Sequence, residues 1–559
     1  PGCGTMAGVT KPEWTKNYQP GVPAEIDLPD EPLSAMFARA ARKGGKRVAL
    51  EFFGATTTYR ELADQVDRAA AGLAALGVGP GDRVAIVLPN CPQHVVAFYA
   101  VLRLGAVVVE HNPLYTATEL ATMFADHGAR VAIAWDVAVP KLPTVEHVVA
   151  VNLLEAFPTV KRLALHLPVP KLAATRKRLH AKAPGTTPWK QLVAHKPIRN
   201  WAEPTASDLA VVQYTSGTIG AFKGAMLTHR NLYANALQGA AWMKDAKDGK
   251  ETIYAVLPMF HAFGMTLYLT FGMLKRARIV LFPTFDVDMV LDAAKKRPPT
   301  VYCAVPPIYE KTARRAIERK VSLKSARFCI SGAMKLTDPV VELWESVSGG
   351  LLVEGYGLTE TAPVALGNPF WPTRRTGTIG VPFPSTQMLV VDPEDPTREV
   401  AQGEEGELLL KGPQVFSGYW NAPEETAKAL LPDGWLRTGD VVVVDADGFT
   451  TIVDRLKEII VTGGFNVSPS EVEHVLVEHP DIEDVAVVGL QTESGEQVAA
   501  AVVLRPGAHL DVAAVRSWAK ERLAAYKVPR SFVEVDELPK SMLGKVLRKQ
   551  VREAITSAS

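Results

Sequence analysis

The chain has 559 residues, of which 47% are hydrophobic, 22% charged and 8% aromatic. This composition suits a globular protein with a large core and excludes a fibrous or disordered chain. The 61 Lys and Arg nearly balance the 60 Asp and Glu, so no global field attracts nucleic acid and any charged partner is met locally.

The N-terminal residues and the cysteines suggest the compartment. The stretch before Met6 lacks the basic and apolar regions of a secretory signal. The four cysteines form no CxxC pair, which favours reduced thiols over disulfides or a metal site. No apolar run reaches the roughly 18–20 residues that span a bilayer. We therefore expect a cytoplasmic protein without a transmembrane anchor.

Apolar runs that predict strands alternate with helical periodicity through much of the chain. The run RVAIVLPN begins at Arg83, and a helical stretch and a β-branched run follow it. Similar strand patterns occupy residues 130–135, 209–214, 252–258, 277–283 and 300–306. This alternation predicts mostly parallel sheets that are covered by helices on both faces.

The pattern changes twice towards the C-terminus. Between Gly377 and Asp454, short alternating runs are separated by Gly, Pro and Asp, which predicts a smaller antiparallel, barrel-like unit. The charged string DRLKE begins at Asp454 and precedes another α/β pattern of about a hundred residues. We expect a hinge at Asp454 and a small domain after it.

Residues 161–199 have an unusual charge composition. They contain ten Lys or Arg and no Asp or Glu, with Leu, Val and Trp189 interleaved. One interpretation is a solvated basic insert on the surface. The other is a contact with a membrane surface or an acidic carrier protein, because basic amphipathic segments bind anionic surfaces.

A phosphate-binding loop is predicted directly after the strand at 209–214. Small residues let backbone N–H groups surround phosphate oxygens, hydroxyls add donors, and Lys223 supplies a mobile cation. The loop is not a Walker A motif, because Phe222 precedes the lysine and Gly224 follows it. Its candidate nucleotide-binding residues are Thr215, Ser216, Gly217, Thr218 and Gly220.

The string YTSGTIGAFKGAMLTH at 214–229 resembles the signature of the adenylate-forming superfamily, which includes acyl-CoA synthetases, luciferases and peptide-synthetase adenylation domains. That signature usually reads YTSGTTGxPKG. Here Ile219 replaces a threonine and removes a hydroxyl, while Phe222 replaces a proline and removes its fixed φ. We expect these departures to weaken or slow the use of ATP.

Two further motifs follow in the order typical of the superfamily. PMFHAFG at 258–264 resembles the motif that lines the carboxylate-substrate site, with His261 at its centre. CISGAMKL at 329–336 resembles the segment along the adenine, with Gly332 and with Ala333 where glycine is common. Downstream of the histidine, candidates for the wall of an acyl tunnel are Phe263, Met265 and Thr266, and core packing is the alternative role for them.

EGYGLTET at 354–361 resembles the superfamily's adenine and metal motif. The resemblance implies that Tyr356 stacks on adenine, that Thr359 meets the phosphates, and that Glu360 holds Mg²⁺ with the help of Thr215. Oxygen ligands suit this hard cation, which usually keeps several waters while it bridges phosphates. The flanking Gly355 and Gly357 are assigned to the nucleotide site as well.

The remaining motifs imply roles for the C-terminal part. RTGD at 437–440 supplies Asp440, which the resemblance assigns to both ribose hydroxyls. DRLKEIIVTGGFNVSPSEVE at 454–473 resembles the hinge and the first mobile segment. The resemblance implies that Arg455 contacts the ribose and that Lys457 contacts a phosphate or ribose oxygen. It also implies that Gly463 and Gly464 act in the thiol half-reaction.

PKSMLGKVLRK at 539–549 resembles the terminal motif that carries the catalytic lysine. Because exposed lysines near a C-terminus are usually solvated, only this pattern selects Lys545 over Lys540 or Lys549. The resemblance thus assigns catalysis to Lys545, Lys223, Glu360 and His261, with ATP, Mg²⁺ and coenzyme A as nucleotide, metal and co-substrate.

The motifs are most similar to those of bacterial, actinobacterial-type, long-chain fatty acid CoA ligases. This implies that a medium- or long-chain fatty acid is converted through acyl-AMP to acyl-CoA, with release of AMP and pyrophosphate. One alternative is a fatty acyl-AMP ligase that loads an acyl-carrier protein, and another is a noncatalytic nucleotide- or lipid-binding protein. We expect no nucleic acid partner, a peripheral membrane contact through 161–199 and a homodimer.

Pattern and resemblance together predict an α/β protein of two domains. The N-terminal domain, 6–454, is expected to hold two doubly wound α/β subdomains and the barrel-like unit, and to bind AMP and the acyl substrate. The C-terminal domain, 455–559, is expected to be a small mobile α+β unit with the catalytic lysine. The resemblance further implies that rotation about the hinge exchanges the groups used in the two half-reactions.

Overall fold

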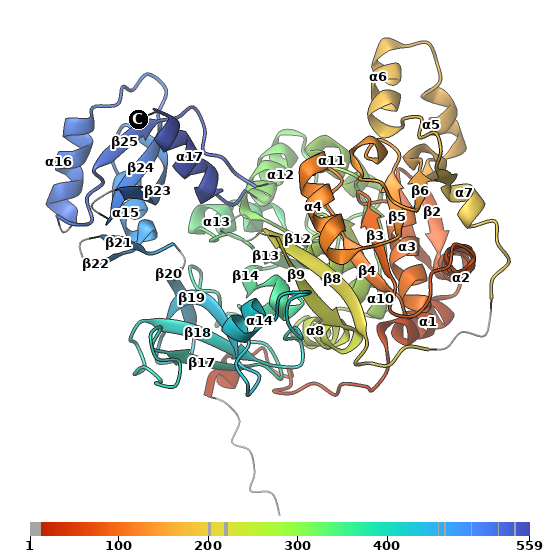
Figure 1. The fold of residues 1–559 in the computed structure, drawn as a ribbon, viewed down its shortest axis with the longest axis horizontal. Helices are drawn as coiled ribbons and strands as arrows, with labels where there is room; N and C mark the ends of the chain where they lie inside the picture. The colour runs from red at the N-terminus through yellow and green to blue at the C-terminus, as the bar shows by residue number, and fades with distance from the viewer. Residues whose placement is uncertain are drawn as a thin grey trace, which may run out of the picture. The chain divides into compact units, whose positions relative to one another are not determined.

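The chain divides into two compact units in a computed structural model (Figure 1). Unit 1 comprises Pro1–Ser216, Phe222–Gln387 and Leu410–Leu436, and unit 2 comprises Met388–Leu409 and Arg437–Ser559. The structure describes residues 13–198, 203–216, 222–456, 458–462, 465–492, 495–523, 525–541 and 544–558. Among the predicted site residues, those outside the described residues are Gly217, Thr218, Ile219, Gly220, Lys457, Gly463 and Gly464.

A seven-stranded sheet of unit 1 has the order β7-β6-β5-β3-β4-β8-β9. All neighbours are parallel except β8 and β9, which form an antiparallel pair. Its strands are β3 (Arg83–Val87), β4 (Val107–Glu110), β5 (Val131–Trp135), β6 (His147–Val151), β7 (Thr187–Pro188), β8 (Leu209–Ser216) and β9 (Phe222–Thr228). Residues of β3 that point to opposite faces, such as Ala85 and Ile86, are all buried. Both faces of this sheet are therefore covered, as the apolar runs predict.

The helices around this sheet begin and end where local signals place them. A capping box of Thr58 and Glu61 begins α2 (Tyr59–Ala75). The helix α4 (Ala117–His127) has a capping box of its own and ends at a left-handed glycine. The other helices before the site are α1 (Leu33–Gly44), α3 (Pro92–Arg103), α5 (Thr159–Ala164), α6 (Pro170–Leu179) and α7 (Trp189–Leu192), with short η1 (Glu13–Asn17), η2 (Val139–Lys141) and η3 (Leu153–Ala156).

A nine-stranded sheet, also in unit 1, has the order β16-β15-β14-β13-β12-β10-β11-β1-β2. It is parallel from β14 to β1 and antiparallel at both edges. Its strands are β1 (Val48–Phe52), β2 (Ala55–Thr58), β10 (Thr252–Ala255), β11 (Arg278–Leu281), β12 (Val301–Ala304), β13 (Phe328–Ser331), β14 (Leu352–Gly357), β15 (Val364–Gly367) and β16 (Val381–Pro382). The two large sheets confirm the predicted α/β class and the predicted strand positions.

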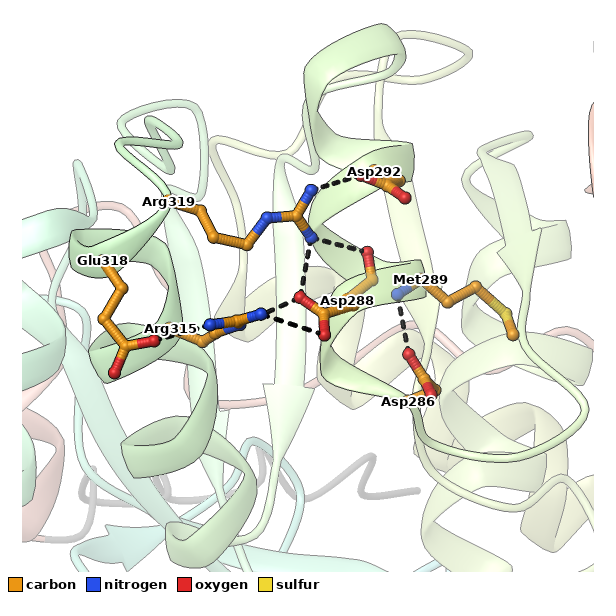
Figure 2. A network of polar contacts seen from close by, with 7 residues as sticks. All are labelled: Asp286, Asp288, Met289, Asp292, Arg315, Glu318 and Arg319. Atoms are coloured by element: carbon orange, nitrogen blue, oxygen red, sulfur yellow. Dashed lines mark hydrogen bonds and ion pairs between the residues drawn. The ribbon is translucent and has the colours of Figure 1, made fainter.

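Helices α11 (Val287–Lys296) and α12 (Pro306–Glu318) lie side by side in unit 1 (Figure 2). Asp288 accepts hydrogen bonds from Arg315 Nε at 2.9 Å and from Arg319 Nη1 at 2.8 Å. Arg319 also donates to Asp292, and Arg315 to Glu318. Beneath this exposed network, the helices pack on a buried core that includes Val290 and Tyr309 and extends to α13 (Asp338–Val347).

Unit 2 contains smaller sheets. A four-stranded sheet of β17 (Gln387–Val391), β18 (Gly406–Lys411), β19 (Leu436–Val444) and β20 (Thr450–Arg455) occupies the region of the predicted barrel-like unit, and β19 pairs antiparallel with β20. Most of this sheet belongs to unit 2 and not to the N-terminal unit, where it was predicted. The C-terminal part contains β21 (Ile460–Thr462), β22 (Phe465–Val467), β23 (Ile482–Thr492), β24 (Gly495–Leu504) and β25 (Ser531–Glu534). Its helices are α15 (Pro469–Val477), α16 (Val512–Arg522) and α17 (Arg548–Ala558). The predicted domain boundary at 454 stays a prediction.

Candidate active site

The β8–β9 hairpin positions the first catalytic candidates of unit 1. In its register Thr215 faces Lys223 and Ser216 faces Phe222. Thr215 Oγ1 also donates to the Lys223 carbonyl at 3.4 Å. The predicted phosphate loop thus connects two paired strands, which fixes both of its ends. Phe222, where the superfamily has proline, begins β9 and packs 5.9 Å from the Tyr115 ring.

A segment far along the chain extends this hairpin. Met226 N donates to the Gly418 carbonyl at 2.9 Å, and Trp420 N donates to the Gly224 carbonyl at 2.7 Å. A Cβ atom on Gly224 would lie 2.7 Å from Val212 and 3.3 Å from Trp420. The glycine after the lysine is therefore required for close packing of the 416–420 segment.

The same segment fixes the predicted metal ligand. Glu360 lies in η5 (Thr359–Thr361), directly after β14, and is half-buried. Its carbonyl accepts from Phe416 N at 2.8 Å, and its Oε1 accepts from the Tyr419 hydroxyl at 2.6 Å. Burial and the nearby Glu360 charge raise the pKa of Tyr419, so the tyrosine remains a donor.

Lys223 contacts the ring of the same tyrosine. Its Nζ lies 5.3 Å from the centroid of the Tyr419 ring and forms an ion pair with Glu425 of α14 (Pro423–Ala429). Hydrogen bonds from Lys223 and then Lys428 lower the pKa of Glu425 to about 2. One tyrosine therefore contacts both the predicted phosphate-binding cation and the predicted metal-binding anion.

Sequence reasoning did not assign Tyr419 and Glu425 a role in the site. Both belong to the string GYWNAPEET at 418–426. That string could be recognised in the sequence, but it does not indicate which residues Tyr419 and Glu425 contact. Lys223 and Glu425 are separated by 202 positions in sequence, and only the pairing of the 416–420 segment with β9 brings them together.

The acyl and adenine motifs meet at one glycine. His261 precedes α9 (Ala262–Gly264), and its Nδ1 accepts from Phe263 N at 3.3 Å. A Cβ atom on Gly332 would lie 3.0 Å from the Phe263 ring and 3.3 Å from the Gly355 carbonyl. The predicted acyl-site aromatic thus contacts the predicted adenine segment directly, and glycine is the residue that permits this approach.

His261 carries no charge near neutral pH. It is half-buried, and desolvation lowers its pKa to about 4. A neutral imidazole can hydrogen-bond to a carboxylate but does not attract it as an ion pair would. The geometry therefore favours a shape-defining and hydrogen-bonding role for this residue.

Backbone conformation explains two residues of the nucleotide motifs. Ala333 has φ +66°, in the left-handed region where glycine is favoured. Its substitution for the usual glycine therefore strains the adenine segment. At Gly357, a Cβ atom would lie 1.8 Å from the Pro363 carbonyl oxygen, so no side chain fits there.

The other candidates of unit 1 are buried to different degrees. Met265 is fully buried at the start of the π-helix η4 (Met265–Phe271), a rare element that often marks functional sites. The Thr266 hydroxyl donates to the Ala362 carbonyl at 2.7 Å. Tyr356 is buried and faces Leu366 across β14 and β15. The acyl and adenine roles of these residues stay predictions.

In unit 2, the predicted ribose-binding residues are neighbours. Asp440 of β19 faces Arg455 of β20 in the strand register, and the aspartate is fully buried. Asp454, the predicted pivot, is buried beside them and accepts a hydrogen bond from Ser468, the N-cap residue of α15. This bond ties the predicted hinge to the helix that follows it.

Two hydrogen bonds join Ser541 and Lys545 of the predicted catalytic-lysine motif. Ser541 N donates to the Lys545 carbonyl at 2.7 Å, and Lys545 N donates to Ser541 Oγ at 3.2 Å. The Lys545 side chain is exposed, whereas Lys540 Nζ pairs with Asp484 at 2.6 Å. The structure thus gives Lys540 an ion-pairing role of its own.

Arg548 connects the start of α17 to the rest of unit 2. Its guanidinium forms ion pairs with Glu458 of the predicted hinge and with Glu473 of α15. It also donates to the Val487 carbonyl at 2.6 Å. These bonds fix the start of α17, three positions after Lys545, to three separate elements.

Comparison with known proteins defines the class of the chain. The family described as AMP-binding enzyme matches residues 37–420, and the AMP-binding enzyme C-terminal domain matches residues 471–545. The chain therefore belongs to the AMP-binding enzyme family.

Named relatives and solved structures extend this result. A "Long-chain-fatty-acid--CoA ligase" of Bacillus subtilis (strain 168) is 38% identical, with 97% of this chain and 98% of the relative covered. One of Salmonella typhimurium is 36% identical at the same coverage. The crystal structure of ATP-bound MatB from Rhodopseudomonas palustris matches with TM-score 0.77 and 29% identity over 93% of this chain and 98% of that one.

Proposed function

We propose that the protein is an ATP-dependent fatty acid–CoA ligase. It activates a medium- or long-chain fatty acid as acyl-AMP with release of pyrophosphate, and then transfers the acyl group to coenzyme A with release of AMP. The observation that carries this function is that Lys223, near the start of β9, and Glu360 both contact Tyr419. The full-length similarity to fatty acid CoA ligases supports the acid and the thiol.

In the first half-reaction, a carboxylate oxygen of the fatty acid attacks the α-phosphorus of ATP and the bond to pyrophosphate breaks. Negative charge gathers on the phosphoryl oxygens while an anionic nucleophile approaches, so cations and N–H donors must neutralise it. Lys223 provides one such cation at the end of the β8–β9 hairpin. In this assignment, Lys545 provides the second.

The donor set suits Mg²⁺. A carboxylate from Glu360 and a hydroxyl from Thr215 are both oxygen ligands, which this hard cation prefers. When bound, the ion supplies charge neutralisation at the phosphates. Tyr419 occupies one oxygen of the carboxylate with its hydrogen bond and thereby orients the other.

In the second half-reaction, the thiolate sulfur of coenzyme A attacks the acyl carbonyl carbon and the bond to AMP breaks. This step needs Asp440 and Arg455 to retain the nucleotide ribose until transfer is complete. Their adjacency across β19 and β20 supports a shared ribose contact. We assign the thiol-facing role to Gly463 and Gly464, by resemblance, and the change between half-reactions to rotation about Asp454.

Substitution of the catalytic lysine tests this scheme. Lys545→Ala should reduce acyl-AMP formation by at least about 100-fold, because a cation that stabilises transition-state charge contributes several kcal/mol. It should leave CoA transfer to preformed acyl-AMP within a few-fold. Pyrophosphate release and thioester formation are measured separately. Lys549→Ala, an exposed lysine in the same motif, is the matched control.

Equal loss of both half-reactions in Lys545→Ala would contradict the assigned role. Acyl-AMP that forms but reacts only with an acyl-carrier protein would instead identify a carrier-loading ligase. Nucleotide binding without any product would identify a noncatalytic protein.

Location and assembly belong to this proposal. No helix among the described residues is both long and apolar enough to cross a membrane. We place the protein in the cytoplasm, with peripheral contact at the inner face of the membrane through 161–199. We also expect a homodimer, which molar mass in solution would test.

A further inference from the structure

Helices α5 and α6 and the connection between them form a hairpin, residues 159–179, that we call the basic hairpin. Figure 1 shows it projecting from the part of unit 1 that holds β5 and β6. Both ends are anchored. Before α5, Phe157 is buried and stacks on Phe53 at 4.2 Å. After α6, Asp136 accepts from His180 and from Ala181 N.

The tip of the basic hairpin is apolar and exposed. Every residue from His166 to Lys171 is exposed. Four of the exposed large hydrophobic side chains in the described part of the chain lie within ten positions of one another, on α5 and at the tip. They are Val160 at 79%, Leu163 at 63%, Leu167 at 54% and Val169 at 44%. Contiguous exposed apolar side chains mark interaction surfaces, whereas single ones are ordinary.

The tip has a defined conformation. Leu167 N donates to the Ala164 carbonyl at 3.1 Å, and Val169 N donates to the Leu167 carbonyl at 2.8 Å. Arg176 of α6 reaches back to the Leu165 carbonyl at 3.3 Å. Pro168 and Pro170 further restrict the backbone. The tip therefore loses little additional conformational entropy when it binds a partner surface.

Within the described residues, the exposed cations of α6 lack acidic partners. Lys171, Lys177 and Arg178 are exposed, and within the described residues none of them forms an ion pair with a carboxylate. The surrounding sequence from 161 to 199 contains no Asp or Glu. Lys161 is different, because it donates to the Phe53 carbonyl at 2.7 Å and so belongs to the anchor.

We propose that the basic hairpin docks on the surface of an anionic lipid bilayer. Leu167 and Val169 at the tip enter the headgroup region, and the cations of α6 contact lipid phosphates. An acidic carrier protein would match the cations but would leave the aliphatic tip against a polar surface. This inference rests on the proposed function in one respect, since a bilayer is where a long-chain fatty acid is concentrated.

Binding to vesicles tests the apolar part. The full chain is sedimented with vesicles of phosphatidylcholine alone or mixed with phosphatidylglycerol. The double variant Leu167→Ser, Val169→Ser should bind the mixed vesicles at least about tenfold more weakly, because two apolar side chains that would be buried in the headgroup region are lost. Ile317→Ser is the matched control, because Ile317 is 53% exposed in α12 of the same unit. Its binding should equal that of the wild type.

The electrostatic part has its own variant. Lys177→Gln with Arg178→Gln should weaken binding about 30-fold, because each cation near an anionic surface contributes about fivefold. The control pair is Lys295→Gln with Lys296→Gln, two exposed lysines at the end of α11. Added salt should weaken wild-type binding more than binding of the variant, which keeps Lys171 but has two cations fewer.

The outcomes separate this inference from the proposed function. Thioester formation from a water-soluble medium-chain acid, without vesicles, should be equal in all these variants and the wild type. Failure of the wild type to bind mixed vesicles, or equal binding by the hairpin variants, would overturn membrane docking. Hairpin-dependent binding to a purified acidic acyl-carrier protein, without vesicle binding, would overturn it in favour of that partner.

Discussion

Two clusters of charged side chains on unit 1 differ in how they are held. On the α11–α12 face (Figure 2), Asp288 accepts from two arginines, and each arginine has a second carboxylate partner. At the nucleotide end, Lys223 pairs with Glu425, and Glu360 accepts from Tyr419. The first network joins neighbouring helices that already share a core. The second holds two charges in place by contacts from one distant segment.

In the proposed function, this difference separates a structural surface from a ligand-binding site. A network with redundant partners tolerates the loss of one, and exposed ion pairs contribute little to stability. A charge held by a single side chain can exchange that partner for a phosphate or a metal ion. The contrast therefore predicts opposite balances of activity and stability when the two clusters are altered.

The largest expected effect concerns Glu354, which is the first residue of the motif at 354–361 and is buried. Burial raises its pKa to about 8 from an ordinary value of 4.5, although Leu336 N donates to it and Lys335 is nearby. The folded protein thus binds more protons than the unfolded chain between these values, so stability falls as pH rises through that window. Relative to Glu354→Gln, the wild type should lose about 3 kcal/mol of unfolding free energy between about pH 5 and about pH 8.

Chemical denaturation at several pH values measures this effect, and Asp288→Asn provides the comparison. Hydrogen bonds from Arg315 lower the pKa of Asp288. Its contribution is present above the ordinary value and is lost only as pH falls below it. The difference between Asp288→Asn and the wild type should therefore be constant over the range in which Glu354 titrates. If the difference in unfolding free energy between Glu354→Gln and the wild type did not change with pH, the burial effect would be contradicted.

Tyr419→Phe should have the next largest effect, on activity rather than on stability. It removes one hydrogen bond to a charged group, which contributes about 1.5–3 kcal/mol. Because that bond orients Glu360, we expect the Mg²⁺ concentration for half-maximal adenylation to rise about tenfold. Magnesium titrations of pyrophosphate release measure it. An unchanged requirement would show that the bond does not position the metal ligand.

Glu425→Gln tests the other contact of the nucleotide-end cluster, the ion pair with Lys223. The carboxylate competes with nucleotide phosphates for Lys223, so its removal should lower the KM for ATP a few-fold. Its low pKa means that this competition persists throughout the neutral range. Initial rates at varied ATP provide the value. A higher KM would instead mean that Glu425 holds the lysine in its productive position.

The smallest effect is expected on the α11–α12 face. Arg315→Gln leaves Asp288 paired with Arg319, and the affected side chains are exposed. Both the thermal midpoint and the rate of thioester formation should stay close to those of the wild type. Calorimetry and an activity assay check this. A marked loss of activity would remove the distinction between the two clusters.

The sequence predicted most strands of the two large sheets, whereas the roles of the motif residues stay predictions. The run from Arg83 became a strand, a helix and a second strand, because apolar periodicity depends on local burial. The strand before the predicted phosphate loop followed from the same reasoning, whereas β9, which begins at Phe222 inside the stretch expected to be a loop, did not. Asp440 and Arg455, chosen from separate motifs by resemblance, face each other across two strands.

Contacts between distant segments could not be predicted in this way. No local pattern indicates that Tyr419 donates to Glu360 or that Glu425 holds Lys223, because these contacts depend on how the 416–420 segment pairs with β9. Phe222 appeared from the sequence only as the loss of a proline, whereas the structure shows it beginning a strand and packing on Tyr115. The strain at Ala333 likewise requires the observed φ.

Product analysis with fatty acids of graded length tests the central claim most directly. Each acid is incubated with MgATP, with and without coenzyme A, and the products are identified by mass spectrometry. The account predicts acyl-CoA and AMP from medium- or long-chain acids when coenzyme A is present. Acyl-AMP that accumulates and does not react with coenzyme A, or no product from any acid, would contradict it.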